Sequence, residues 1–162
     1  MTTIQNKIET IGIAADHGGF ELKEYLKKML IEQEYEIIDF GNKELIPSDD
    51  YPDYVIPLAN AISNGIISRG IAICGSGVGA CIVANKVAGV RGCLIHEEFS
   101  AQQGVEDDDM NLICLGGRVI DDTLALKLST IFLSAKFIDI ERHTRRLEKI
   151  TELENQQKLK LQ

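Results

Sequence analysis

A thiol, a hydroxyl and three glycines stand within six positions in the stretch CGSGVG, residues 74 to 79. An apolar run comes before it and a segment with helical character follows. The thiolate of a cysteine is favoured at the start of a helix, where it can act as a base or a nucleophile. Backbone N–H groups beside the thiol could hold an oxygen that becomes negative during a reaction. The stretch therefore predicts proton abstraction next to a carbonyl, with Cys74 as the base.

Other interpretations of this loop remain open. It can be a tight turn around a buried thiol. Gly75, Gly77 and Ala80 also fit the permissive G-x-G-x-x-G/A pattern of dinucleotide sites, with Glu97 at a distance suited to a ribose. That pattern, however, follows the third apolar run here, whereas dinucleotide sites use the first. A cysteine hydrolase would need His17 as its base.

An acid and an imidazole follow the first apolar run. Asp16 and His17 come directly after residues 11–15, and two glycines succeed them. A lone histidine is commonly a structural residue, but a place between an acid and glycines at the end of a strand favours binding or catalysis. Both side chains are therefore candidates for the site.

The densest group of basic residues in this acidic chain lies near its C-terminus and consists of Arg142, His143, Arg145 and Arg146. One turn of helix would put Arg142 and Arg146 on the same side, four residues apart, which suits a phosphate group. The alternative is a solvated helix face. Arg118 follows the glycine pair after the last apolar run and could join them.

The bulk composition narrows the class of protein. The chain has 162 residues, of which 44% are hydrophobic and 26% charged, so it is long enough for one globular domain. Its net charge of −8 argues against a nucleic-acid partner. The N-terminus lacks the apolar core of a secretory signal, and no apolar run is long enough to cross a membrane. We expect a soluble cytoplasmic protein.

The cysteines do not indicate disulfides or a metal site. There is no C-x-x-C pair and no Cys/His cluster with zinc spacing. Cys81, Cys93 and Cys114 lie within apolar patterns, where a cysteine usually serves as a small buried hydrophobe.

Apolar runs alternate with helical periodicity along the chain. The expected strands are residues 11–15, 35–40, 70–74, 91–95 and 111–115. The expected helices begin at residue 20, cover 54–68, run from the glycine loop to about 88, cover 97–106 and 121–136, and end with a charged C-terminal helix. This alternation predicts an α/β fold, a doubly wound, Rossmann-like five-stranded parallel sheet in the order 2-1-3-4-5. Residues 1–141 would form one domain, with helix 142–162 packing on it or on a partner subunit.

The predicted strand order brings the candidate residues together. Strands 1 and 3 are neighbours in it, and ligands of such sheets bind outside the carboxyl ends of strands where the order reverses. Asp16, His17, Cys74 and Ser76 should therefore meet at one edge of the sheet.

At this point the sequence resembles a known family. The segments IAADHGGFELK, DYPDYV, ICGSGVGACIVANKVAGVRG, FSAQ, NLICLGGRVI and ERHTRRLEKI resemble ribose-5-phosphate isomerase type B, whose family also includes galactose-6-phosphate isomerase subunits. The resemblance runs in order from about residue 10 to residue 151. It implies an aldose–ketose isomerase that interconverts ribose 5-phosphate and ribulose 5-phosphate with neither a metal nor an organic cofactor.

The resemblance also implies roles for the candidate residues. Cys74 would move the proton between C1 and C2 through a cis-enediolate. The anion hole and hydroxyl contacts would come from Ser76 and the backbone of Gly75, Gly77, Val78 and Gly79. Asp16 would contact sugar oxygens, and Tyr51 would line the pocket. The phosphate would be bound by His17, Arg118, Arg142 and Arg146. The family implies a homo-oligomer, a dimer or a tetramer, whose pocket is shared across the dimer interface.

One segment departs from the family pattern. Members commonly carry His-Asn before strand 5, where the histidine helps to open the furanose ring, whereas this chain has Asp107 and Asp108 in the segment GVEDDDMNL. A carboxylate can still accept a proton from the anomeric hydroxyl but cannot donate one as an imidazolium does. Three hypotheses follow: a phosphopentose isomerase, an isomerase of galactose or allose 6-phosphate, and a catalytically silent phosphosugar-binding protein.

Overall fold

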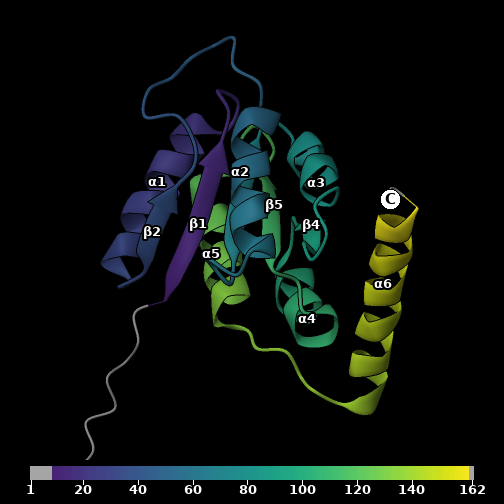
Figure 1. Cartoon of the computed structure of the whole chain (residues 1–162). Coiled ribbons are helices and arrows are strands. Elements are labelled where there is room, and N and C mark those ends of the chain that lie inside the picture. The colour runs from purple at the N-terminus through teal and green to yellow at the C-terminus, as the bar shows by residue number, and fades with distance from the viewer. Residues whose placement is uncertain (1–8, 161–162) are drawn as a thin grey trace, which may run out of the picture.

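A computed structural model describes residues 9–160 (Figure 1). Its strands are β1 (Thr10–Ala15), β2 (Glu36–Asp39), β3 (Gly70–Cys74), β4 (Gly92–Leu94) and β5 (Leu112–Gly116). They pair in parallel as a five-stranded sheet in the order β2-β1-β3-β5-β4. The predicted α/β fold with a parallel five-stranded sheet is confirmed.

The predicted order of the last two strands is wrong. The sequence suggests 2-1-3-4-5, but β5 pairs with β3, and β4 lies at the edge. The physical reason is the burial of the two strands. All five residues of β5 are buried, whereas β4 has three residues and exposes the middle one. The strand that is covered on both faces takes the inner position, and the short strand takes the edge.

Helices cover both faces of the sheet. They are α1 (Phe20–Glu32), α2 (Pro52–Ser63), α3 (Val78–Ala84), α4 (Glu98–Asp108), α5 (Asp122–Ser134) and α6 (Glu141–Leu159). One core cluster joins α1, α4 and α5 to the sheet, and the other joins α2 and α3 to its opposite face. The side chains of β1 alternate between them, because Ile11 and Ile13 belong to the first cluster and Ala14 to the second.

A glycine in β1 sets the distance between the sheet and α2. A Cβ atom at Gly12 would collide with the side chain of Leu58 on α2 and with that of Ile67, in the segment between α2 and β3. The loop before α2 ends at Tyr51, and Pro52 takes the first helical position, where its missing N–H costs nothing. The helix therefore begins two residues earlier than the sequence suggests and ends five residues earlier than expected, at Ser63.

The C-terminal helix α6 runs beside α3, β4 and α4 instead of lying on the sheet (Figure 1). The segment just before it is tied to the end of α4, since the N–H of Ile138 donates to the carbonyl of Glu106 at 2.9 Å. Within residues 9–160, none of the helices combines the length and the apolar character needed to cross a bilayer.

The cysteines other than Cys74 differ in exposure. Cys114 on β5 is buried, Cys81 on α3 is partly buried and Cys93 on β4 is exposed. The expectation of three buried thiols is therefore wrong for Cys93, because the edge strand leaves its side chain uncovered.

Candidate active site

A pocket of about 430 Å³ lies at the carboxyl ends of β1, β3 and β5. Its lining residues are Asp16, Tyr51, Cys74, Gly75, Ser76, Gly79, Arg118 and Val119. All except Val119 are among the residues that the sequence predicts for the site. The strand register explains why they meet. Ala15 pairs with Ile73, and Cys74 pairs with Gly116, so the loops after three neighbouring strands open at one edge.

The Cys74 thiol forms the floor of this pocket. It is 5% exposed, and its Sγ accepts a hydrogen bond from the N–H of Gly77 at 3.1 Å. Gly77 has a φ of +80°, and a Cβ there would come within 2.8 Å of the backbone of Leu115 on β5. Only glycine fits this turn, which aims an N–H group at the sulfur.

Two backbone N–H groups of the glycine loop donate hydrogen bonds to side chains of the same loop. The N–H of Gly77 donates to Cys74, and the N–H of Val78 donates to Oγ of Ser76 at 3.3 Å. Gly77 and Val78 are not among the lining residues, whereas Gly75, Ser76 and Gly79 are. Contacts from this loop to a ligand would therefore come from the latter three.

Asp16 and Arg118 stand on either side of the thiol loop. The Asp16 carboxylate is buried and accepts a hydrogen bond from the N–H of Gly18 at 2.9 Å. Burial raises the pKa of Asp16, and the Gly18 hydrogen bond opposes that rise. The backbone N–H of Arg118 donates to the carbonyl of Gly75 at 3.0 Å, which fixes the loop after β5 against the loop after β3.

His17 lies beside the pocket but is not among its lining residues. Its backbone N–H and its ring Nδ1 both lie 2.8 Å from Oδ1 of Asp49. The hydrogen bond to Asp49 raises the pKa of His17 above its ordinary value, with burial acting in the opposite direction. The side-chain atoms of Asp16, His17 and Asp49 that could bind a metal ion lie within 4.8 Å of one another. Each of these side chains already takes part in one of the hydrogen bonds described above.

Tyr51 covers one side of the pocket from the start of α2. A Cβ at Gly79 would come within 2.6 Å of the Tyr51 ring, so the ring lies directly against the backbone of α3. The contact joins the two helices that pack on this face of the sheet.

Four further predicted site residues lie well away from this pocket. Asp107 and Asp108 end α4, a few residues before β5 begins, whereas Cys74 pairs with the last residue of β5. The length of that strand, roughly 3.3 Å for each of its residues, separates them. Arg142 and Arg146 lie in the first turns of α6, which is tied to the same end of α4.

His143 holds this second group together. It is 1% exposed, and its Nδ1 lies 2.9 Å from the carbonyl oxygen of Ile138. Its Nε2 accepts a hydrogen bond from Nε of Arg142 at 3.0 Å and lies 3.4 Å from Oδ1 of Asp107. The buried ring therefore positions the arginine on α6, and the acid on α4 lies next to it.

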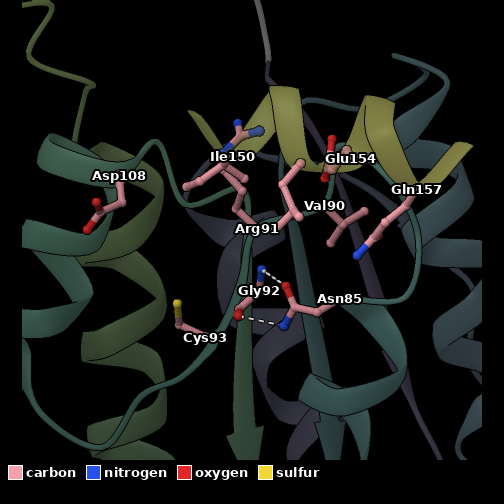
Figure 2. A pocket seen from close by; sticks show the side chains of 10 residues that line it. Asn85, Val90, Arg91, Gly92, Cys93, Asp108, Ile150, Glu154 and Gln157 are labelled. Carbon is pink, nitrogen blue, oxygen red and sulfur yellow. Dashed lines mark hydrogen bonds between the residues drawn. The ribbon is translucent and has the colours of Figure 1, made fainter. Parts of the chain in front are cut away.

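A second cavity of about 410 Å³ separates α6 from α3 and β4 (Figure 2). Asn85 braces its floor by exchanging two hydrogen bonds with the backbone of Gly92, at 2.8 and 2.9 Å. Ile150 and Leu153 of α6 line the opposite wall, and Asp108 is also a lining residue. The cavity leaves apolar side chains of α6 partly uncovered.

Two features have no signal in the sequence. Asp49 is one of several acids in a turn-rich loop, and nothing in the pattern marks it as the partner of His17. Cys81 lies in an ordinary helix, yet a hydrogen bond from Cys114, against the opposing effect of burial, lowers its pKa to about 6. The contact of Asp49 and the pKa of Cys81 both depend on which strand or loop the fold places next to these residues.

The family model described as Ribose/Galactose Isomerase matches residues 11–150. The chain belongs to this family. The match covers both the pocket loops and the first half of α6, and it confirms the resemblance carried by the sequence motifs. Membership of the ribose/galactose isomerase family identifies the chain as an isomerase.

Curated relatives in this family match the chain along most of their length. A putative sugar phosphate isomerase of Bacillus subtilis is 41% identical, over 89% of this chain and 96% of its own. A probable ribose-5-phosphate isomerase B of Mycoplasma pneumoniae is 40% identical, over 90% and 95%. A D-erythrulose-4-phosphate isomerase of Pectobacterium atrosepticum is 36% identical, over 92% and 97%.

Solved structures in the ribose/galactose isomerase family share the fold. Ribose-5-phosphate isomerase B of Clostridium thermocellum has a TM-score of 0.87 at 41% identity, covering 91% of this chain and 98% of that one. The enzyme of Mycoplasma genitalium, solved with bound ribulose-5-phosphate, has a TM-score of 0.85 at 37% identity, covering 90% and 96%.

Proposed function

We propose that this isomerase interconverts D-ribose 5-phosphate and D-ribulose 5-phosphate with Cys74 as the base. The observation that carries the proposal is the pocket, which Cys74, Asp16 and Arg118 line together. The relatives named for ribose 5-phosphate, and the related structure with bound ribulose-5-phosphate, support this choice of substrate.

The first step is proton abstraction from C2 of the open-chain aldose. The Cys74 thiolate takes the proton, and the electrons of the C–H bond form a double bond between C1 and C2. The carbonyl oxygen on C1 becomes negative, which gives a cis-enediolate. Donors from Gly75, Ser76 and Gly79 would hold this oxygen, because these residues line the pocket beside the sulfur.

The second step returns the proton to C1. The Cys74 thiol donates it there, while the hydroxyl proton on O2 moves to O1, so that C2 becomes the carbonyl carbon. Asp16 is placed to contact these oxygens, and its raised pKa suits a group that exchanges protons with a sugar hydroxyl. Tyr51 would close the pocket over the sugar. No atom is gained or lost, as an isomerisation requires.

A second copy of the chain would complete the site. Asp107, Asp108, Arg142 and Arg146 are too far along β5 and α6 to reach Cys74 of their own chain, as the strand register implies. In a homodimer they could reach the partner's pocket, where the two arginines would join His17 and Arg118 around the phosphate and Asp107 would act in ring opening.

Exposed apolar residues support such a dimer. Phe99, at the start of α4, is 74% exposed, and Val119, at the rim of the pocket, is 55% exposed. Leu153 on α6 is 55% exposed and lines the second cavity. Large apolar side chains at the pocket and along a projecting helix are typical of a surface that is covered in the assembly.

The departure at Asp107 favours a second candidate, an isomerase of another phosphosugar such as galactose or allose 6-phosphate. The related D-erythrulose-4-phosphate isomerase shows that the family accepts different chain lengths. Turnover of ribose 5-phosphate compared with the two 6-phosphohexoses distinguishes the candidates. Stabilisation of the protein by ribose 5-phosphate without any ketose product would instead indicate a silent binding protein.

The test of the proposed mechanism is Cys74→Ala, assayed by ketose formation from ribose 5-phosphate. We expect kcat to fall about 10²- to 10⁴-fold, because a general base is removed. Binding of the phosphosugar, measured by thermal shift, should persist. Cys93→Ala is the matched control, since that thiol is exposed and lies on the edge strand. A loss of less than about tenfold in Cys74→Ala would contradict the role of the sulfur.

A further inference from the structure

Asp49 lies outside the pocket but makes the closest polar contacts of His17. Both the backbone N–H and the ring Nδ1 of His17 are 2.8 Å from the same oxygen, Oδ1 of Asp49. We propose that Asp49 is a positioning residue that fixes the ring of His17 through Nδ1, so that Nε2 can donate to the phosphate of the substrate. The inference rests on the proposed function, in which His17 contacts that phosphate.

The chemistry of the imidazole makes the contact directional. A carboxylate accepts hydrogen bonds and donates none, so Asp49 keeps a proton on Nδ1 of His17. Nε2 then carries a proton only when the ring is an imidazolium. The negative charge of Asp49 stabilises that form. One carboxylate therefore sets both the orientation of the ring and its ability to donate to an anion.

Asp49 is itself anchored to the interior. Its Oδ2 accepts a hydrogen bond from Nδ2 of Asn42 at 2.5 Å, and the backbone carbonyl of Asn42 accepts one from Nζ of Lys23 at 2.9 Å. The Lys23 side chain is fully buried and also donates to Asp39 at 2.7 Å. The connection thus runs from Lys23 on α1 through the loop before α2 to His17, just beyond the end of β1.

This anchoring explains how a turn-rich loop can hold a side chain in place. A buried lysine ammonium that lost one of its partners would pay a large desolvation cost, so the carbonyl of Asn42 is held firmly. Asn42 then limits the movement of Asp49, and Asp49 limits that of His17. Asp50, the next residue in the same loop, is exposed and provides an acid of similar position without these contacts.

The charges around His17 favour its protonated form. Asp49 and Asp16 are the ionisable groups that face the ring, and both raise its pKa. Burial would raise the pKa of Asp49, but hydrogen bonds from His17, Tyr54 and Asn42 outweigh it and lower that pKa, so Asp49 stays ionised. His17 gains a proton more readily in the folded protein than in a free peptide.

A pH dependence follows from the sign of these shifts. Phosphate binding through Nε2 is strong below the pKa of His17, where the ring is charged, and weakens as the pH rises through it. The phosphate monoester becomes a dianion above about pH 6. Removal of the Asp49 charge lowers the pKa of His17, so the rise in KM should begin at a lower pH.

The experiment compares Asp49→Asn, Asp49→Ala and the control Asp50→Asn by steady-state kinetics across pH and by NMR titration of the His17 ring. Asp49→Asn keeps an acceptor for Nδ1 but loses the charge, and Asp49→Ala loses both. We expect KM at pH 7.5 to rise about tenfold in Asp49→Asn and further in Asp49→Ala, with kcat within about threefold. The pKa of His17 should fall in both variants and stay unchanged in Asp50→Asn.

A double variant isolates the positioning role. When His17 is replaced by Gln, the further change Asp49→Asn should add almost nothing to KM, because Asp49 acts through the ring. Fully additive effects, an unchanged pKa of His17, or a fall in kcat at constant KM would each overturn the proposal. If Asp49→Ala proves unstable, Asn42→Ala removes one anchor of Asp49 and should raise KM in the same direction.

Failure of the proposed function would look different. In that case wild-type protein would convert no ribose 5-phosphate, whatever residue stands at position 49. The titration of His17 and the affinity for inorganic phosphate would then still decide the inference. Asp49→Asn should lower that pKa and weaken phosphate binding about tenfold relative to Asp50→Asn. Equal affinities would overturn it.

Discussion

The two ends of the sheet hold polar residues in different ways. At the carboxyl ends of β1, β3 and β5, Asp16, Cys74 and Arg118 surround an open pocket. At the opposite end, Asp107 and Arg142 contact the buried ring of His143. The first end is shaped to receive a ligand. The second is a group of side chains on the outside of the fold, where α4 meets α6. The latter helix stands apart from the sheet (Figure 1).

This difference shows which groups of the proposed site are missing at each end. The pocket is lined by a thiol, a carboxyl group and a hydroxyl but by only one arginine. The α4–α6 end offers two more arginines and an acid but no thiol, since Cys74 lies at the far end of the sheet. Each end lacks what the other carries, which is why we propose that a second copy brings them together.

The largest expected effect comes from substituting residues of one end in one chain and residues of the other end in a second chain. Cys74→Ala and the double variant Arg142→Ala/Arg146→Ala should each be nearly inactive, the latter by about 10²- to 10³-fold in kcat/KM from the loss of charged hydrogen bonds. Mixed in equal amounts and refolded together, they should recover about one quarter of wild-type activity, because half of the dimers carry one intact site.

Recovery on mixing is the decisive readout, and sedimentation should show a dimer in the same samples. If the two inactive proteins form mixed dimers but stay inactive, Cys74, Arg142 and Arg146 act in the site of a single chain, which would contradict the comparison.

A smaller effect is expected at the α4–α6 end. His143→Ala removes a buried ring with three polar neighbours and should lower the free energy of unfolding by about 1–3 kcal/mol. It should also lower kcat/KM about tenfold, chiefly through KM, because Arg142 loses its hydrogen bond. Chemical denaturation and steady-state kinetics measure the two quantities.

Lys149→Ala, at an exposed position of the same helix, is the control and should change neither quantity. If His143→Ala lowers stability but leaves KM at the wild-type value, His143 stabilises the fold without positioning the arginine.

The smallest effect is expected from Gly79→Ala at the pocket end. The new Cβ would come within 2.6 Å of the Tyr51 ring, so the ring must move away from α3. Because Tyr51 can rotate into the open pocket, we expect KM to rise about threefold with less than about 1 kcal/mol of destabilisation. An unchanged KM, measured with ribose 5-phosphate, would show that this side of the pocket does not contact the sugar.

Much of the pocket could be predicted from the sequence, because it depends on local patterns. The apolar runs of β1 and β3 and the glycines that follow them are continuous in the chain, and parallel strands end at the same edge of a sheet. The order of β4 and β5 could not be predicted in this way. Both runs are short and apolar, and only packing decides which of them is covered on both faces.

The contacts of Asp49 and His143 could not be predicted from the sequence either. Asp49 and Asp50 are adjacent acids in one loop, and only the fold turns the first toward His17. The same holds for His143, whose contacts with Arg142 and Asp107 come from two helices separated by the whole of β5 and α5.

The sequence by itself determined the parallel α/β fold, the family and the thiol loop, because these follow from hydrophobic periodicity and from short motifs whose residues are neighbours in the chain. Only the tertiary structure decided that β5 is central, that Asp49 holds His17, and that the C-terminal arginines lie at the opposite end from Cys74. Those facts depend on long-range packing, in which the burial of one strand or helix sets the position of residues far away in the chain.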